Sequence, residues 1–98
     1  MSVSVGLLVT LHAKPGKAGE LAAFLEAGRA LAQAEQQTVT WYAFQVDEST
    51  YGIFDTFEGE EGRQAHLSGE IATALAEHGP ELLASDPDLR RVSILAVK

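Results

Sequence analysis

Residues 40–57 read TWYAFQVDESTYGIFDTF, and this stretch decides which fold the chain adopts. Its two halves are rich in aromatic and β-branched residues, which favour strands, and a short polar DES segment separates them. Two such runs around a short polar loop indicate a β-hairpin. The stretch also holds the only Trp, both Tyr and three of the four Phe of the chain, so these aromatics either fill a core or line a pocket.

The segments on either side extend the hairpin into a six-element pattern. Residues 4–13 (SVGLLVTLHA) and 90–98 (RRVSILAVK) have strand composition, next to the turn signals KPG and ASDPDL. Residues 17–34 repeat apolar side chains at helical spacing, and so do residues 67–78. The order β-α-β-β-α-β is typical of an α+β, ferredoxin-like fold, with a four-stranded antiparallel sheet and both helices on one face. A chain of 98 residues is expected to form one domain, residues 1–98.

Apolar residues occupy both faces of the first and last predicted strands. Leu7 and Val9 point to one side of the sheet, and Leu8 points to the other. Helices on one side cover only one of these faces, so the other needs a second cover. We expect that cover to be another copy of the sheet, which predicts a homodimer.

The composition limits the kinds of partner and cofactor. A net charge of −7 leaves no basic surface for phosphates, so neither a nucleic acid nor an anionic membrane is an expected partner. Cys is absent, and the three His lack the spacing of a metal site, so no metal site is predicted. The N-terminal segment lacks the cationic start of a signal peptide, which makes the cytoplasm the expected location.

The acidic residue inside the hairpin needs a partner. A symmetric pairing about the loop places Asp55 opposite Tyr42. Phe44 and Phe57 then lie on the same face, which the helices cover, and Trp41 lies on the other face. A lone carboxylate is costly to bury, so Asp55 should pair with the Tyr42 hydroxyl, an arginine or a backbone donor. A structural network and a catalytic role both explain such a carboxylate.

His66 is the second residue that draws attention. On a straight helix it would lie away from the apolar stripe around Leu67 and be solvated. Ser68 and Gly69 offer a break at which Ser68 begins a new helix, and such a break would turn His66 toward the sheet. There the imidazole could act as a base or as a donor. Arg63 in the same segment could bind a ligand carboxylate or lie on a solvated helix face.

The segments LHAKPGK, TVTWYAFQV, YGIFDTFE and GRQAHL, in this order, resemble the antibiotic biosynthesis monooxygenase family over nearly the whole chain. The family implies a ferredoxin-like fold whose dimer joins two sheets into an α+β barrel. Its characterised members include enzymes that oxygenate phenols to quinones without metal or flavin, quinol monooxygenases, haem-degrading enzymes and an isomerase. Asp55 matches an acidic family position and His66 a family His, and Trp41 and Tyr42 fall where pocket aromatics are plausible. Haem degradation is not expected, because the haem-degrading members use an Asn and this chain has none.

The residues and the resemblance lead to one main hypothesis, a cofactor-independent monooxygenase for a small phenol, quinol or polyketide-like aromatic. His66 would be the base, and Tyr42 or Trp41 would hydrogen-bond the developing oxyanion. The other side chains expected at the site are Asp55 as a further catalytic residue and Phe44, Phe57 and Arg63 as substrate contacts. Two alternatives stay open: a non-enzymatic dimeric barrel that binds a small apolar ligand or a protein partner, and a cofactor-free isomerase.

Overall fold

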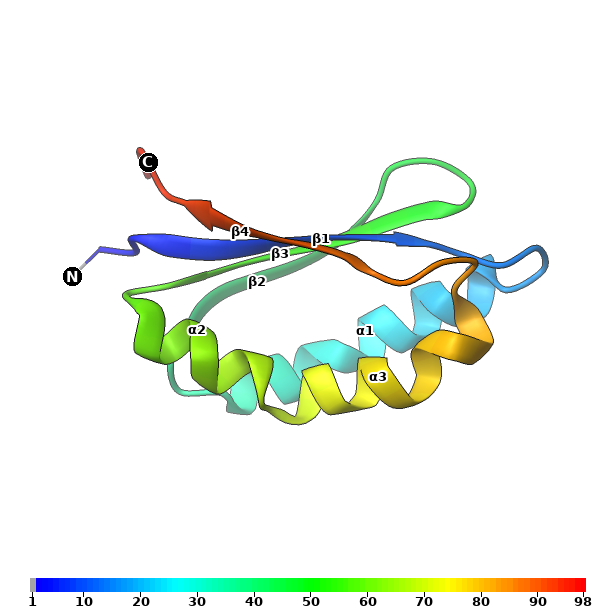
Figure 1. The fold of residues 1–98 in the computed structure, drawn as a ribbon, viewed down its shortest axis with the longest axis horizontal. Coiled ribbons are helices and arrows are strands. Elements are labelled where there is room, and N and C mark those ends of the chain that lie inside the picture. Colours follow the sequence, from blue (N-terminus) through cyan, green and yellow to red (C-terminus); the bar gives the residue numbers. More distant parts are fainter. Residues whose placement is uncertain (1) are drawn as a thin grey trace.

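The computed structural model describes residues 2–98 and contains a four-stranded antiparallel sheet with helices on one face (Figure 1). The strands are β1 (Val5–His12), β2 (Thr38–Gln45), β3 (Thr50–Phe57) and β4 (Asp88–Ser93), in the spatial order β2-β3-β1-β4. The helices are α1 (Ala18–Ala34), α2 (Glu60–Leu67) and α3 (Glu70–Leu82). The predicted α+β, ferredoxin-like arrangement is confirmed, and its second helical segment is divided into α2 and α3. Met1 of the expected domain lies outside the described residues.

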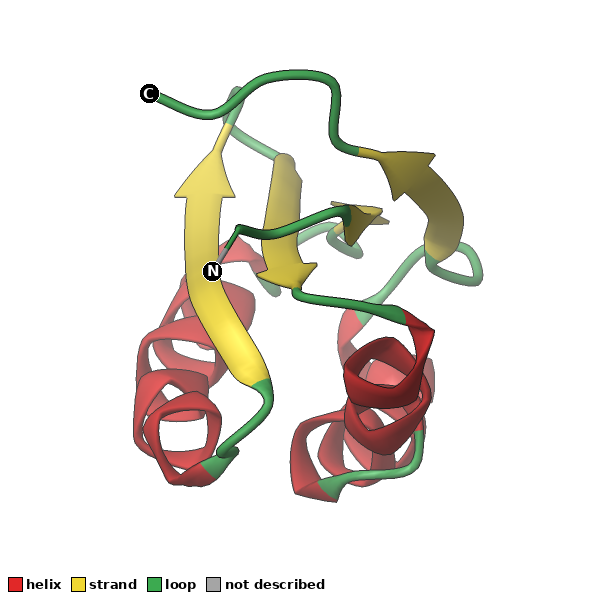
Figure 2. Ribbon diagram, turned by 90° about the vertical axis from the view of Figure 1, so that its left-hand side faces the viewer, coloured by secondary structure: helices red, strands yellow, loops and turns green. Residues whose placement is uncertain are grey.

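The core lies between the sheet and the helices, which form two layers (Figure 2). Leu7 and Val9 of β1 are buried in this layer, and Leu8 between them is only half-buried on the opposite face. The predicted alternation of β1 is therefore confirmed. The other large apolar side chains buried in the layer are Leu11, Leu21, Leu25, Tyr51, Ile53, Phe57, Ile71, Leu82 and Leu83.

The β2–β3 pairing differs from the predicted register by one residue. Trp41 lies opposite Asp55, and Tyr42 lies opposite Phe54. Because side chains alternate along a strand, a slip of one residue moves every side chain of β2 to the other face. The predicted helix-side positions of Tyr42 and Phe44 are therefore wrong, and so is the predicted outer position of Trp41.

The loop of the hairpin explains the shifted register. The Asp47 carboxylate accepts hydrogen bonds from the backbone N–H groups of Ser49 at 3.0 Å and Thr50 at 2.8 Å. The N–H of Val46 donates to the carbonyl of Thr50, also at 2.8 Å, and closes the strands around residues 47–49. A symmetric pairing around residues 47–50 assumes a loop that is longer by one residue, which is why the predicted partners are displaced by one.

The opposite face of the sheet is left open by residues 2–98 (Figure 1). Tyr42 is 59% exposed there, and the ring of Phe44 lies over Gly52, where an added Cβ would collide with it. β4 ends at Ser93, so the predicted strand over residues 90–98 runs too far. The side chain of Leu95, beyond that end, is 97% exposed.

Candidate functional site

The junction between α2 and α3 determines where His66 points. The N–H and the hydroxyl of Ser68 both donate to the carbonyl of Gln64 at 3.2 Å, so Ser68 ends α2. Gly69 is the residue that precedes α3. The predicted break is present, but Ser68 closes the first helix and does not begin the second. The break directs His66 at the sheet, where it is 8% exposed and its ring centroid lies 5.4 Å from that of Phe57.

His66 lies between two carboxylates, and we call this set the Glu35–His66–Asp55 cluster. Its Nδ1 atom is 2.6 Å from Oε1 of Glu35, the residue that follows α1. Its Nε2 atom is 3.0 Å from Oδ2 of Asp55, which is completely buried on β3. The partner that Asp55 requires is therefore His66, and the three partners suggested from the sequence are wrong.

The two contacts of His66 differ in quality. The contact with Glu35 is a short hydrogen bond. The Nε2 atom is close enough to Asp55 for an ion pair, but its N–H is not aligned for a hydrogen bond, and neither oxygen of Asp55 has an aligned donor within residues 2–98. Asp55 is thus held mainly by the charge of the imidazole. A buried carboxylate with so few donors depends strongly on that charge.

The cluster keeps His66 protonated. Burial by itself lowers the pKa of His66, because it disfavours the charged imidazole. The carboxylates of Asp55 and Glu35 act in the opposite direction and raise this pKa from its ordinary value of 6.5 to about 9. At neutral pH His66 is therefore an imidazolium ion, which donates hydrogen bonds and stabilises anions.

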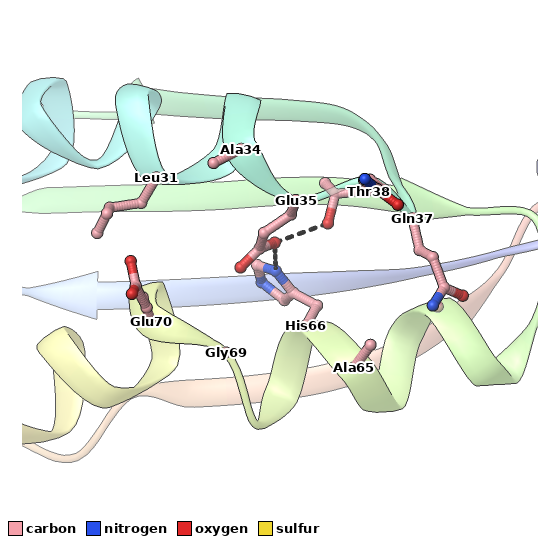
Figure 3. Close-up of a pocket in the computed structure, with 11 residues that line it drawn as sticks. Leu31, Ala34, Glu35, Gln37, Thr38, Ala65, His66, Gly69 and Glu70 are labelled. Atoms are coloured by element: carbon pink, nitrogen blue, oxygen red, sulfur yellow. Dashed lines mark hydrogen bonds and ion pairs between the residues drawn. The ribbon is translucent and has the colours of Figure 1, made fainter.

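Glu35 is held by two donors that meet at one oxygen (Figure 3). Its Oε1 atom accepts the bond from His66 and another from the hydroxyl of Thr38 at 2.7 Å. Thr38 reaches Glu35 because the β2–β3 ladder is irregular between Thr38 and Thr40, so that Thr38 lies opposite the buried Phe57. The second oxygen, Oε2, is buried without a partner among the described residues.

An open groove of about 450 Å³ gives access to the cluster, and we call it the α1–α2 groove. In Figure 3, Glu35 and His66 form part of its wall, and the carboxylate of Glu70 points into it from the start of α3. Gly69 leaves space for Glu35, because a Cβ at this position would come within 2.8 Å of Oε2. The complete lining is Leu31, Ala34, Glu35, Gln36, Gln37, Thr38, Gly62, Ala65, His66, Gly69 and Glu70.

Only part of the predicted site is brought together. His66, Asp55 and Phe57 lie side by side, and Trp41 is on the same face of the sheet, opposite Asp55. Trp41 packs against α1, where its ring is 3.4 Å from a Cβ built on Gly28, and its Nε1 is buried without a partner among the described residues.

The remaining predicted residues lie away from the groove. Tyr42 and Phe44 occupy the open face of the sheet. The guanidinium of Arg63 forms two 2.7 Å hydrogen bonds with Glu60 and donates to the carbonyl of Gly6 at 3.2 Å. These bonds tie the start of α2 to β1, so Arg63 has a structural role in this arrangement.

Sequence reasoning missed Glu35, although a signal for it exists. Glu35 is the residue that follows α1, where the negative end of the helix dipole disfavours an acidic side chain. A nearby cation offsets this unfavourable effect, and His66 is that cation.

Two further kinds of feature are absent from residues 2–98. Three or more His, Asp or Glu side chains are nowhere grouped in a way that could hold a metal ion within this part of the chain. None of the described helices has the length and apolarity that a bilayer crossing needs.

Solved structures provide close relatives of this fold. The chain is 46% identical to a protein of unknown function from Nitrosomonas europaea, with a TM-score of 0.96 over 98% of this chain and 93% of the other. Two proteins named as candidate antibiotic biosynthesis monooxygenases share the fold. The one from Caulobacter crescentus has a TM-score of 0.81 and 18% identity over 96% of this chain and 92% of its own. The one from Chloroflexus aurantiacus has a TM-score of 0.76 and 21% identity over 97% and 96%. No family model and no curated protein matches the sequence.

Proposed function

We propose that this chain oxygenates a small phenol without a cofactor. The proposal starts from its membership of the fold family of the antibiotic biosynthesis monooxygenases. One observation carries the proposal. A buried imidazolium, His66, is fixed between two carboxylates at the wall of an open groove. A cation fixed in this way stabilises a phenolate without having to reorganise, and phenolate formation is the step that makes the ring reactive toward O₂.

Oxygenation of a phenol requires few catalytic groups from the protein. A phenolate can pass an electron to O₂ directly. When the ring C–H opposite the hydroxyl becomes a carbonyl, one oxygen atom enters the ring, the other leaves as water, and the substrate supplies all four electrons. The product is a quinone. The protein needs to bind the anion, accept a proton and limit the access of water.

The composition of the α1–α2 groove supports this use. Its volume of about 450 Å³ lies within the range of small-molecule sites. Gln36, Gln37 and Thr38 offer polar groups for the oxygens of a phenol, and Leu31 and Ala34 offer apolar contact for its ring. In this proposal His66 is the anion-stabilising residue, and the residues on the open face do not contact the substrate.

The proposal is tested by measuring O₂ uptake with a panel of anthrones, naphthols and quinols. We expect at least one compound to be consumed with the formation of a quinone and water, and we expect His66→Gln to abolish this turnover. His12→Gln serves as the matched control, because His12 is exposed at the end of β1. The absence of turnover across the panel, or full activity of His66→Gln, would rule the proposal out. Binding of a phenol without O₂ uptake would indicate a ligand-binding protein instead.

We also propose that the open face of the sheet forms a homodimer. Tyr42 and Phe44 are exposed on this face next to the half-buried Leu8 and Phe54, so pairing two copies would remove apolar surface from water. Sedimentation velocity should report a dimer, and Tyr42→Glu should shift it to the monomer. A monomeric wild type at high concentration would contradict this assembly.

A further inference from the structure

The two hydrogen bonds that end on Glu35 outline a site for a single oxyanion. His66 Nδ1 on α2 and Thr38 Oγ1 on β2 donate to the same oxygen, at 2.6 Å and 2.7 Å. Two donors from different elements that converge on one oxygen are the arrangement by which proteins stabilise an oxyanion. In Figure 3 both dashed lines end on this one atom of Glu35.

We infer that the Glu35 carboxylate occupies the place of the ligand's oxyanion, and that the α1–α2 groove selects an acidic phenol or enol. Such a ligand gives its proton to Glu35, and its oxyanion then takes the place of the Glu35 carboxylate beside His66. The inference rests on the proposed function, because it names the substrate class of the same site. It also assigns Glu35 a role as proton acceptor and as internal competitor.

Glu35 is free enough to make this exchange. It follows the last residue of α1, and its side chain is 19% exposed at the groove. Only the two bonds to Oε1 hold its carboxylate, since Oε2 has no partner among the described residues. Rotation of this side chain therefore breaks two hydrogen bonds and leaves the helix and the sheet unchanged.

The balance of charge favours a neutral acid over a permanent anion. In the free protein, the carboxylates that face His66 or its groove are Glu35, Asp55 and Glu70. When a phenol gives its proton to Glu35, its oxyanion takes over the pairing with His66 and the total charge of the site stays the same. A carboxylate or phosphate ligand would add a negative charge beside Asp55 and Glu70, which repel it.

The acidity of the ligand then sets the affinity. Transfer of the proton to a carboxylate becomes ten times more favourable for each tenfold increase in the acidity of the ligand hydroxyl. Simple phenols are therefore poor ligands. A phenol or enol conjugated with a carbonyl group is better, because it is acidic and its anion is still electron-rich enough to react with O₂.

The test uses 4-nitrophenol as the probe, at a pH where the free compound is mostly neutral. Binding to the wild-type protein should produce the visible absorption band of the phenolate, and less acidic phenols should bind progressively more weakly. Glu35→Ala should strengthen binding by about ten- to a hundredfold, the range of one charge-assisted hydrogen bond. Glu77→Ala is the matched control, because Glu77 is exposed on α3 and does not line the groove, and it should change affinity by less than about threefold. His66→Gln should lose the phenolate band.

The direction of the Glu35→Ala effect decides the question. Weaker binding by this variant, or a bound probe that stays neutral, would overturn the inference. Glu35→Gln keeps the shape of the side chain but replaces the charged competitor for His66 with a neutral amide, so it should strengthen binding in the same direction. It decides the matter if the alanine variant does not fold. Phenolate binding without O₂ uptake leaves the inference standing and refutes the oxygenase. O₂ uptake by the wild type, combined with weakened binding by Glu35→Ala, would support the oxygenase and refute the inference about Glu35.

Discussion

Raising the pH from about 6 to about 10 should lower the free energy of unfolding by about 2–3 kcal/mol through His66 alone. In the folded chain the pKa of His66 is raised to about 9, and its ordinary value is 6.5. A shift of this size corresponds to about 3 kcal/mol at 1.36 kcal/mol per pH unit. Solvent on the groove side screens part of this energy, which gives the lower end of the expected range.

The sign follows from proton binding in the two states. Below pH 6.5 His66 carries its proton in both the folded and the unfolded chain, so the full stabilisation is present. Between pH 6.5 and about 9 the folded chain keeps the proton and the unfolded chain loses it, so stability falls as the pH rises. Above that range the contribution is gone.

The assay is urea unfolding at closely spaced pH values, followed by fluorescence. Trp41 is the only Trp of the chain and lies on the face of the sheet that carries Asp55, so its emission reports on the relevant region. The pH dependence of His66→Gln should be flatter than that of the wild type by the predicted amount. His78→Gln should keep the wild-type slope, because His78 is exposed on α3.

An NMR titration of the His66 ring provides the direct check. A midpoint near the ordinary value of 6.5, or equal pH slopes for the wild type and His66→Gln, would refute the reasoning that two carboxylates hold the proton.

Three further variants test separate parts of the site. Asp55→Asn should lower the pKa of His66 by more than about one unit in an NMR titration, because it removes one of the two charges that raise it. Gly69→Ala should also lower the pKa of His66, since the added Cβ would displace the carboxylate of Glu35. Gly19→Ala is the control, because Gly19 has open space around it. This control should leave the pKa of His66 unchanged and stabilise α1 by about 0.5–1 kcal/mol in urea unfolding. Arg63→Met should lower the free energy of unfolding by about 1–3 kcal/mol and leave binding of 4-nitrophenol unaffected. Weakened binding by this variant would instead support the prediction that Arg63 contacts the substrate.

The elements that could be predicted are those with a strong periodic pattern. Leu7 and Val9 on one face of β1 and the apolar repeat of α1 define the sheet and its covered side. The break after α2 was also foreseeable from Ser68 and Gly69.

The pairing of β2 was not predictable in the same way, because it depends on how Asp47 folds the loop. A carboxylate that caps backbone N–H groups shortens the loop by one residue, and composition alone does not reveal this. Glu35 was missed for a related reason. Its place after α1 is a local signal that a cation should lie nearby, but His66 is 31 positions away, and no local pattern identifies it as that cation.

That separation has a consequence for how the chain folds. The Glu35–His66–Asp55 cluster links the end of α1, the middle of β3 and the end of α2, so it forms only after these elements have docked. Contacts made after the transition state slow unfolding and have little effect on the folding rate. Deprotonation of His66 at alkaline pH should therefore raise the unfolding rate and leave the refolding rate almost unchanged.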